Sequence, residues 1–265
     1  MQTYDILLEQ TITDYINTHP LLTSNQRLAL YKINSYSNNP LIQSNLNNPL
    51  VFFFEGAGSS QIPTVSLYDD TPSILDDISY QGYRYGAMVV AIQSGAIKGV
   101  YINTTTLPDQ PKGNACNAGR DVPTLRPGVY KMVYATHGQG KNAYAALHVV
   151  GEDNNVVRFD ITKWYLSRSD AINIHKGPYP DESGIEYFSV NPSDTWSISS
   201  GCILVDIGEY NNFAKAVGFD KDGDGRIDKK DKISGCVIID RSLMDITRSD
   251  LQYLYGNDGL ALISS

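Results

Sequence analysis

Apolar residues recur at intervals of three and four through the first 40 positions of the chain. Leu8, Ile12 and Ile16 share one face at this spacing, which is typical of an amphipathic helix. The pattern predicts that this helix ends near residues 18–20 and that a second helix starts at Thr23 or Ser24 as its cap. We therefore expect residues 1–80 to form a mainly helical region that serves as an adaptor or a lid.

From about Gly82 the pattern changes to short apolar runs separated by turn residues. The run AMVVAIQSGAIKGVYINT predicts two strands joined at Ser94–Gly95, and PGVYKMVYATHG, AYAALHVV, AINIHKG, GCILVDIG and GCVIIDR predict further strands. Only GEYNNFAKAVG and a segment near residues 249–255 read as helices in this part. We expect a β-rich α+β fold, with residues 81–265 as its β domain.

Composition and charge narrow the range of partners. The 265 residues carry a net charge of −8, and Lys and Arg never occur in runs longer than two, which argues against binding to a nucleic-acid backbone. No stretch of 18 apolar residues predicts a membrane span. The first residues lack a basic segment followed by an apolar one, so we expect no signal peptide and synthesis in the cytoplasm.

The most specific local motif is the acidic loop DKDGDGRIDKKD at residues 220–231. Its oxygen donors occupy loop positions 1, 3, 5, 9 and 12, which are Asp220, Asp222, Asp224, Asp228 and Asp231. A glycine stands at position 6, where a loop that wraps around one cation must turn sharply. The loop resembles EF-hand loops, above all the dockerin variety, and the resemblance implies that the backbone carbonyl of Arg226 is a further ligand. We expect a bound Ca²⁺ with a structural role.

A cysteine and a histidine provide the second candidate for chemistry. The chain has three cysteines, an odd number that disfavours a disulfide framework. Cys202 precedes an apolar run, and His175 lies 27 residues upstream in another β-like run, so two neighbouring strands would bring thiol and imidazole together. Gly201 allows a tight backbone approach, and main-chain N–H groups near Cys202 are candidates for an oxyanion hole.

The sequence around this pair resembles the catalytic domain of L,D-transpeptidases. That family carries a His–Gly pair followed by Ser–His–Gly–Cys and an apolar residue. Here His175 matches the first histidine, with Lys176 inserted before Gly177, and SSGCI at residues 199–203 matches the second block. VPTLRPGVYKM at residues 122–132 resembles an upstream family segment. Two positions depart from the pattern: Ser200 replaces the family's second histidine, and Leu204–Val205 stand where an arginine often follows the cysteine.

The resemblance implies a β-sandwich with short helices and a peptidoglycan stem peptide as substrate. In that comparison Cys202 is the nucleophile and His175 the general base, while Ser199, Ser200 and Gly201 form the pocket wall and the oxyanion hole. The acyl-enzyme would be resolved by an amine or by water. Without a signal peptide, the protein would reach the cell wall through lysis, injection or carriage by a particle.

Two other functions remain open. A catalytically inactive β module, stiffened by calcium, could belong to a phage tail or a contractile injection particle, with the helical region contacting particle components. A zinc hydrolase would draw ligands from His137, His148, His175 and Asp206, although no tight metal-binding spacing such as HExxH is present. Among the remaining candidates, His137 is expected in an exposed turn, His148 in the core or the cleft, Trp196 near the groove, and Cys236 in the core.

Overall fold

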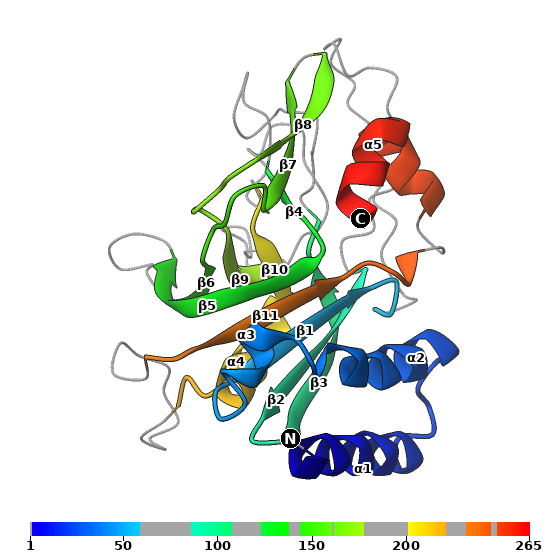
Figure 1. Cartoon of the computed structure of the whole chain (residues 1–265), viewed down its shortest axis with the longest axis vertical. Coiled ribbons are helices and arrows are strands. Elements are labelled where there is room, and N and C mark those ends of the chain that lie inside the picture. Colours follow the sequence, from blue (N-terminus) through cyan, green and yellow to red (C-terminus); the bar gives the residue numbers. More distant parts are fainter. Residues whose placement is uncertain are drawn as a thin grey trace, which may run out of the picture.

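A computed structural model describes residues 2–58, 86–107, 123–137, 144–160, 162–177, 201–220, 232–244 and 248–265. The helices are α1 Gln2–Thr18, α2 Ser24–Lys32, the 3₁₀ turn η1 Ile33–Tyr36, α3 Pro40–Gln43, α4 Ile207–Ala216 and α5 Arg248–Ser264. The strands are β1 Leu50–Glu55, β2 Ala87–Gln93, β3 Ala96–Thr105, β4 Thr124–Leu125, β5 Gly128–His137, β6 Tyr144–Val149, β7 Val156–Asp160, β8 Lys163–Ser167, β9 Asn173–Gly177, β10 Ile203–Asp206 and β11 Ser234–Asp240. Figure 1 shows their arrangement.

Eight strands form one closed barrel in the order β1-β11-β5-β6-β9-β10-β3-β2, and β4, β7 and β8 form a separate sheet. The expected β-rich α+β class is confirmed. The main sheet differs from the expected sandwich, because β1 pairs in parallel with β11 and antiparallel with β2, which joins the two ends of the sheet. Ser94 and Gly95 have φ of 51° and 76°, as the two-residue turn of the predicted β2–β3 hairpin requires.

Alternate residues of the barrel strands fill its interior. Phe53, Val89, Leu147 and Ile174 are fully buried there, as the two-residue period of a strand dictates. Helix α4 packs against the same core through Phe213, which is also fully buried. The side chain of Asp206 caps this helix by accepting a hydrogen bond from the Gly208 N–H at 2.8 Å.

The N-terminal helices cover the outer face of part of the barrel. Helix α2 starts at the predicted place, where Thr23 and Gln26 exchange side-chain and backbone hydrogen bonds as a capping box. Ile12, Leu30 and other helical residues pack against the outward side chains of β1, β2 and β11. Strand β1 is therefore apolar on both faces, which explains its continuous run LVFFFE. Residues 1–80 thus contribute a barrel strand in addition to the helices that pack on it.

The small sheet and α5 form a second, smaller core. Figure 1 shows α5 in red beside β7 and β8, and Val157, Tyr255 and Leu260 are buried between them. The buried Arg241 side chain connects this unit to the barrel, since it donates to the Ile263 carbonyl and to the Thr106 hydroxyl at 3.2 and 2.9 Å. Within the described residues, no helix is both long and apolar enough to cross a membrane.

Candidate active site

Strand β9 carries His175, and Cys202 immediately precedes the neighbouring strand β10 in the barrel wall. The two strands are parallel neighbours, with Ile203 opposite Ile174 and Leu204 opposite His175. Because Ile174 and Ile203 point into the core, His175 and Leu204 point outward. Cys202, just before β10, lies at the level of the beginning of β9. The expectation that these two β-like runs are neighbouring strands is confirmed.

The thiol of Cys202 lies against the backbone at the beginning of β9. Its Sγ–H donates to the Ala171 carbonyl oxygen at 3.7 Å. Burial raises the pKa of the Cys202 thiol, and a hydrogen bond with the backbone of Asn173 lowers it by less. The residue as a whole keeps part of its surface exposed. At neutral pH this environment favours the thiol over the thiolate.

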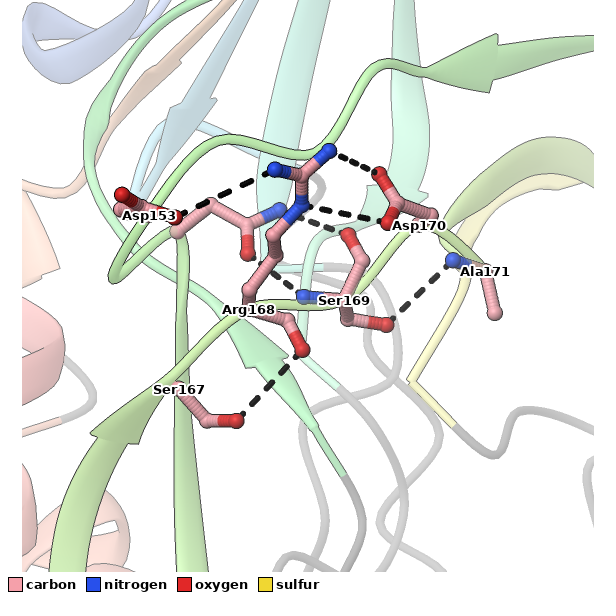
Figure 2. Close-up of polar contacts among 7 residues, drawn as sticks. Asp153, Ser167, Arg168, Ser169, Asp170 and Ala171 are labelled. Carbon is pink, nitrogen blue, oxygen red and sulfur yellow. Dashed lines mark hydrogen bonds and ion pairs between the residues drawn. The ribbon is translucent and has the colours of Figure 1, made fainter.

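The bend that presents Ala171 to the thiol is held by a network of polar contacts, shown in Figure 2. The guanidinium of Arg168 meets both carboxylate oxygens of Asp170 at 3.2 Å, and the Ala171 N–H donates to the Ser169 hydroxyl at 3.3 Å. Asn155, from the turn before β7, donates to the Ser169 carbonyl and accepts from its N–H at 2.9 and 2.8 Å. The chain segment that leads into β9 is therefore held by polar contacts on both sides of Ser169.

His175 is a buried, neutral imidazole with a defined tautomer. Its side chain is only 3% exposed, and its Nδ1 lies 2.8 Å from the Lys176 carbonyl oxygen and 3.2 Å from the Tyr144 hydroxyl. Because a carbonyl oxygen only accepts, we assign the ring proton to Nδ1, which leaves the Nε2 lone pair to accept a proton. Burial, reinforced by the charge of His137, lowers the pKa of His175 to about 3.

His137 belongs to this site, which corrects the expectation that it lies in an exposed turn. It ends β5, and its ring stacks on that of His175 with centroids 3.8 Å apart and planes 13° from parallel. Ala146 of β6 lies between the two histidines in the sheet, and the strand registers put it beside His175. Its small methyl group leaves room for both rings. Burial lowers the pKa of His137. No spacing in the sequence indicates this contact, because it depends on the register across β5, β6 and β9.

Two further side chains complete this part of the wall. The Lys176 ammonium group lies 4.4 Å from the centroid of the Tyr144 ring, within the range of a cation–π contact. His148 lies on β6 opposite Asn173 of β9, and its Nδ1 is 3.2 Å from the side-chain oxygen of Asn173. His148 points away from the barrel interior, which its strand neighbours Leu147 and Val149 fill, so it is not a core residue.

Gly201 occupies a position that only glycine suits. Its φ is 118°, and a β-carbon there would lie 2.5 Å from the Pro123 carbonyl oxygen. The contact brings together two segments that carry the family resemblance, one around Pro123 and the other around Cys202. Ser199 and Ser200, and also Cys116 and Trp196, lie outside the described residues.

The expected metal sites are described only in part. Of the calcium loop only Asp220 is described, and Asp222, Asp224, Arg226, Asp228 and Asp231 lie outside the described residues. For the zinc alternative, the rings of His137 and His175 stack face to face, so their nitrogen lone pairs do not converge, and Asp206 caps α4. Within the described ranges, no group of three His, Cys, Asp or Glu side chains is arranged to hold a metal ion.

No family model, curated protein sequence or solved structure matches this chain. The function is therefore argued from the site itself.

Proposed function

We propose that the protein is a cysteine-dependent acyltransferase or hydrolase of the L,D-transpeptidase kind, with peptidoglycan stem peptides as substrate. The observation that supports the proposal is the parallel pairing of β9, which carries His175, with β10, which Cys202 immediately precedes. The contact between Gly201 and Pro123 adds support, because it joins the two segments in which the sequence resembles that family.

The electrostatics of the pair indicate how the reaction would start. A thiol whose pKa is raised and an imidazole whose pKa is lowered form a neutral pair at rest, so proton transfer must accompany attack. The Cys202 Sγ–H bond breaks as its proton passes to Nε2 of His175, and Sγ forms a bond to the substrate carbonyl carbon. Collapse of the tetrahedral intermediate expels the amine, which takes that proton from His175 and leaves a thioester on Cys202.

The second half of the reaction returns the enzyme to its starting state. An amine or a water molecule gives a proton to His175 and bonds to the thioester carbon. The carbon–sulfur bond then breaks, and the sulfur recovers the proton as Cys202 thiol. Ser199, Ser200 and the Gly201 backbone are the proposed pocket wall and oxyanion hole. An amine acceptor makes the reaction a transpeptidation, and water makes it a hydrolysis.

Digestion of purified peptidoglycan tests the proposal. Wild-type protein, Cys202→Ala and the matched control Cys236→Ala are incubated with the same material, and the fragments are read by mass spectrometry. We expect new fragments or new cross-links from the wild type and from Cys236→Ala, and none from Cys202→Ala. Identical fragment profiles from the wild type and Cys202→Ala would remove the activity.

A specific observation favours a second candidate, an inactive structural or binding module of a phage tail or contractile injection particle. The raised pKa of the Cys202 thiol is the opposite of what an activated cysteine needs at rest, and Ser200 stands in place of a family histidine. In that case Cys202→Ala would leave every property of the protein except its thiol content unchanged.

We also infer a structural Ca²⁺ in the loop at residues 220–231, on the sequence spacing of its acidic residues. A ligand bound only by the folded state stabilises it by about 2.7 kcal/mol at 100 times its Kd. Chelator should therefore lower the melting temperature and added Ca²⁺ should restore it, with Mg²⁺ as the comparison ion. An unchanged melting temperature at millimolar Ca²⁺ would exclude the bound ion.

A further inference from the structure

A cleft of about 880 Å³ opens at the end of the barrel far from Cys202. Its walls come from the loop before β1, the β2–β3 hairpin, the end of α4 and the start of β11. The cleft and the site near Cys202 lie at opposite ends of strand β3. Lys98, near the start of β3, lines the cleft, whereas Thr105, at its end, lies opposite Leu204 of β10. Seven residues of extended strand span about 23 Å. The cleft is therefore a different site from the one proposed for catalysis.

The described residues that line this cleft, which we call the lysine cleft, carry more positive than negative charge, although the net charge of the protein is negative. Its described lining residues include three lysines, Lys98, Lys215 and Lys232, and one carboxylate, that of Asp220, whereas the whole chain has a net charge of −8. Within the described part of the chain, no ion pair joins Lys98 or Lys215 to a carboxylate. Both ammonium groups can therefore neutralise an anion that enters the cleft.

The walls of the cleft are fixed by the fold. On one side the Pro49 carbonyl accepts from the Cys236 N–H at 3.1 Å, and a β-carbon at Gly235 would lie 2.0 Å from that carbonyl oxygen. On the other side α4 ends in a turn at Gly218, with φ of 92°, and the Phe219 N–H donates to the Ala214 carbonyl at 3.0 Å. A ligand would bind to a preformed surface and would not have to order these segments.

The neutral groups of the lining indicate what else the ligand carries. Asn48 and Gln93 offer amide donors and acceptors. Such groups pair with hydroxyls, while lysine ammonium groups bind phosphate or carboxylate as point charges. The volume lies within the roughly 300–1,000 Å³ of sites for small ligands.

We propose that the lysine cleft binds an anionic saccharide, with its phosphate or carboxylate group between Lys98, Lys215 and Lys232 and its hydroxyls on Asn48 and Gln93. This inference goes beyond the proposed acyl transfer and does not depend on it.

Isothermal titration calorimetry of the full chain at low salt tests this site. The probes are glucose 6-phosphate, glucuronate, inorganic phosphate and uncharged glucose. The cleft variant is Lys98→Glu/Lys215→Glu. Its matched control is Lys131→Glu/Lys163→Glu, which makes the same change of net charge at two exposed lysines outside the cleft. Circular dichroism and thermal unfolding establish that both variants fold.

We expect glucose 6-phosphate or glucuronate to bind the wild type and the control within about twofold of each other, and at least about tenfold more weakly to the cleft variant. The stronger of these two probes identifies the anionic group. The inference is overturned if neither anionic sugar binds the wild type, if both variants weaken binding equally, or if glucose or inorganic phosphate binds as tightly as the anionic sugars.

Discussion

The two walls of the barrel each carry a cysteine, and their surroundings differ. On β11 the Cys236 side chain is fully buried beneath the N-terminal helices, where its Sγ–H donates to the Leu41 carbonyl at 3.5 Å and burial raises its pKa to about 11. On the opposite wall Cys202 immediately precedes β10, whose neighbour β9 carries His175, and it keeps part of its surface exposed.

This difference shows that the cover over a strand's outer face, more than the strand itself, decides what a cysteine can do. Both thiols have a pKa raised by burial, so neither is ionised at rest. The strand next to Cys202 carries an imidazole, His175, whereas the residue opposite Cys236 on β5 is Lys131. The helical cover makes one wall a second hydrophobic core, and the outward polar residues make the other wall a candidate active site.

The largest expected effect concerns the stability contributed by the covered wall. Phe52 on β1 is 2% exposed and packs under the helices, stacked beside Phe54. Phe52→Ala removes this packing and leaves a cavity, so we expect a loss of about 3–5 kcal/mol in the free energy of unfolding measured with urea. The control on the other wall, His148→Ala, should lose about 1 kcal/mol, the value of one hydrogen bond. Equal losses of unfolding free energy in Phe52→Ala and His148→Ala would show that the wall under the helices contributes no more stability than the other wall.

Thiol labelling distinguishes the two cysteines directly. Cys236 reacts only when its cover opens, so we expect iodoacetamide to modify Cys202 at least about 100-fold faster in the folded protein. Because its pKa is raised, the rate at Cys202 should still be increasing with pH above 8.5, the ordinary value for cysteine. Peptide mass spectrometry follows both sites. Faster labelling of Cys236 would reverse the assignment of roles.

Acidification should destabilise the wall that carries His175. An unfolded imidazole has a pKa near 6.5, whereas His175 in the fold has a pKa of about 3. Between these values the unfolded state binds a proton that the folded state does not, so the free energy of unfolding falls as pH falls, by up to about 1.4 kcal/mol per pH unit.

Urea unfolding at pH 7, 6 and 5 measures this slope. We expect His175→Phe to depend less on pH than the wild type over this range. The control His19→Phe, at an exposed histidine, should keep the slope of the wild type. A His175→Phe variant with an unchanged slope would show that His175 does not titrate as described.

The smallest effect concerns the stacked pair of histidines. His137→Phe keeps an aromatic ring against His175 and removes the charge that helps to lower the pKa of His175. We expect that pKa to rise by less than about one unit, because burial is the larger cause. Titration of the imidazole Cε1–H resonances by NMR measures it. Tyr144→Phe, which removes a hydroxyl and no charge, is the control. A lower pKa for His175 in His137→Phe would contradict the stacking argument.

Much of the fold could be predicted because the patterns that specify it are local. The capping residue Thr23 marked the start of α2, and Ser94–Gly95 marked the β2–β3 turn, since both depend on hydrogen bonds and dihedral angles within a few residues. Closure of the barrel through β1 was not predictable in this way. Its run of five apolar residues, Leu50–Phe54, is too short to distinguish strand from helix without knowledge of its partners.

For the candidate site, local sequence specifies which functional groups are present: one thiol beside an apolar run, one imidazole upstream of it, and a glycine where the backbone must come close to Pro123. How these groups meet depends on the tertiary fold. Strand register brought His137 onto His175, and desolvation set the direction of every pKa shift there. Both depend on residues distant in the chain, so no local pattern encodes them.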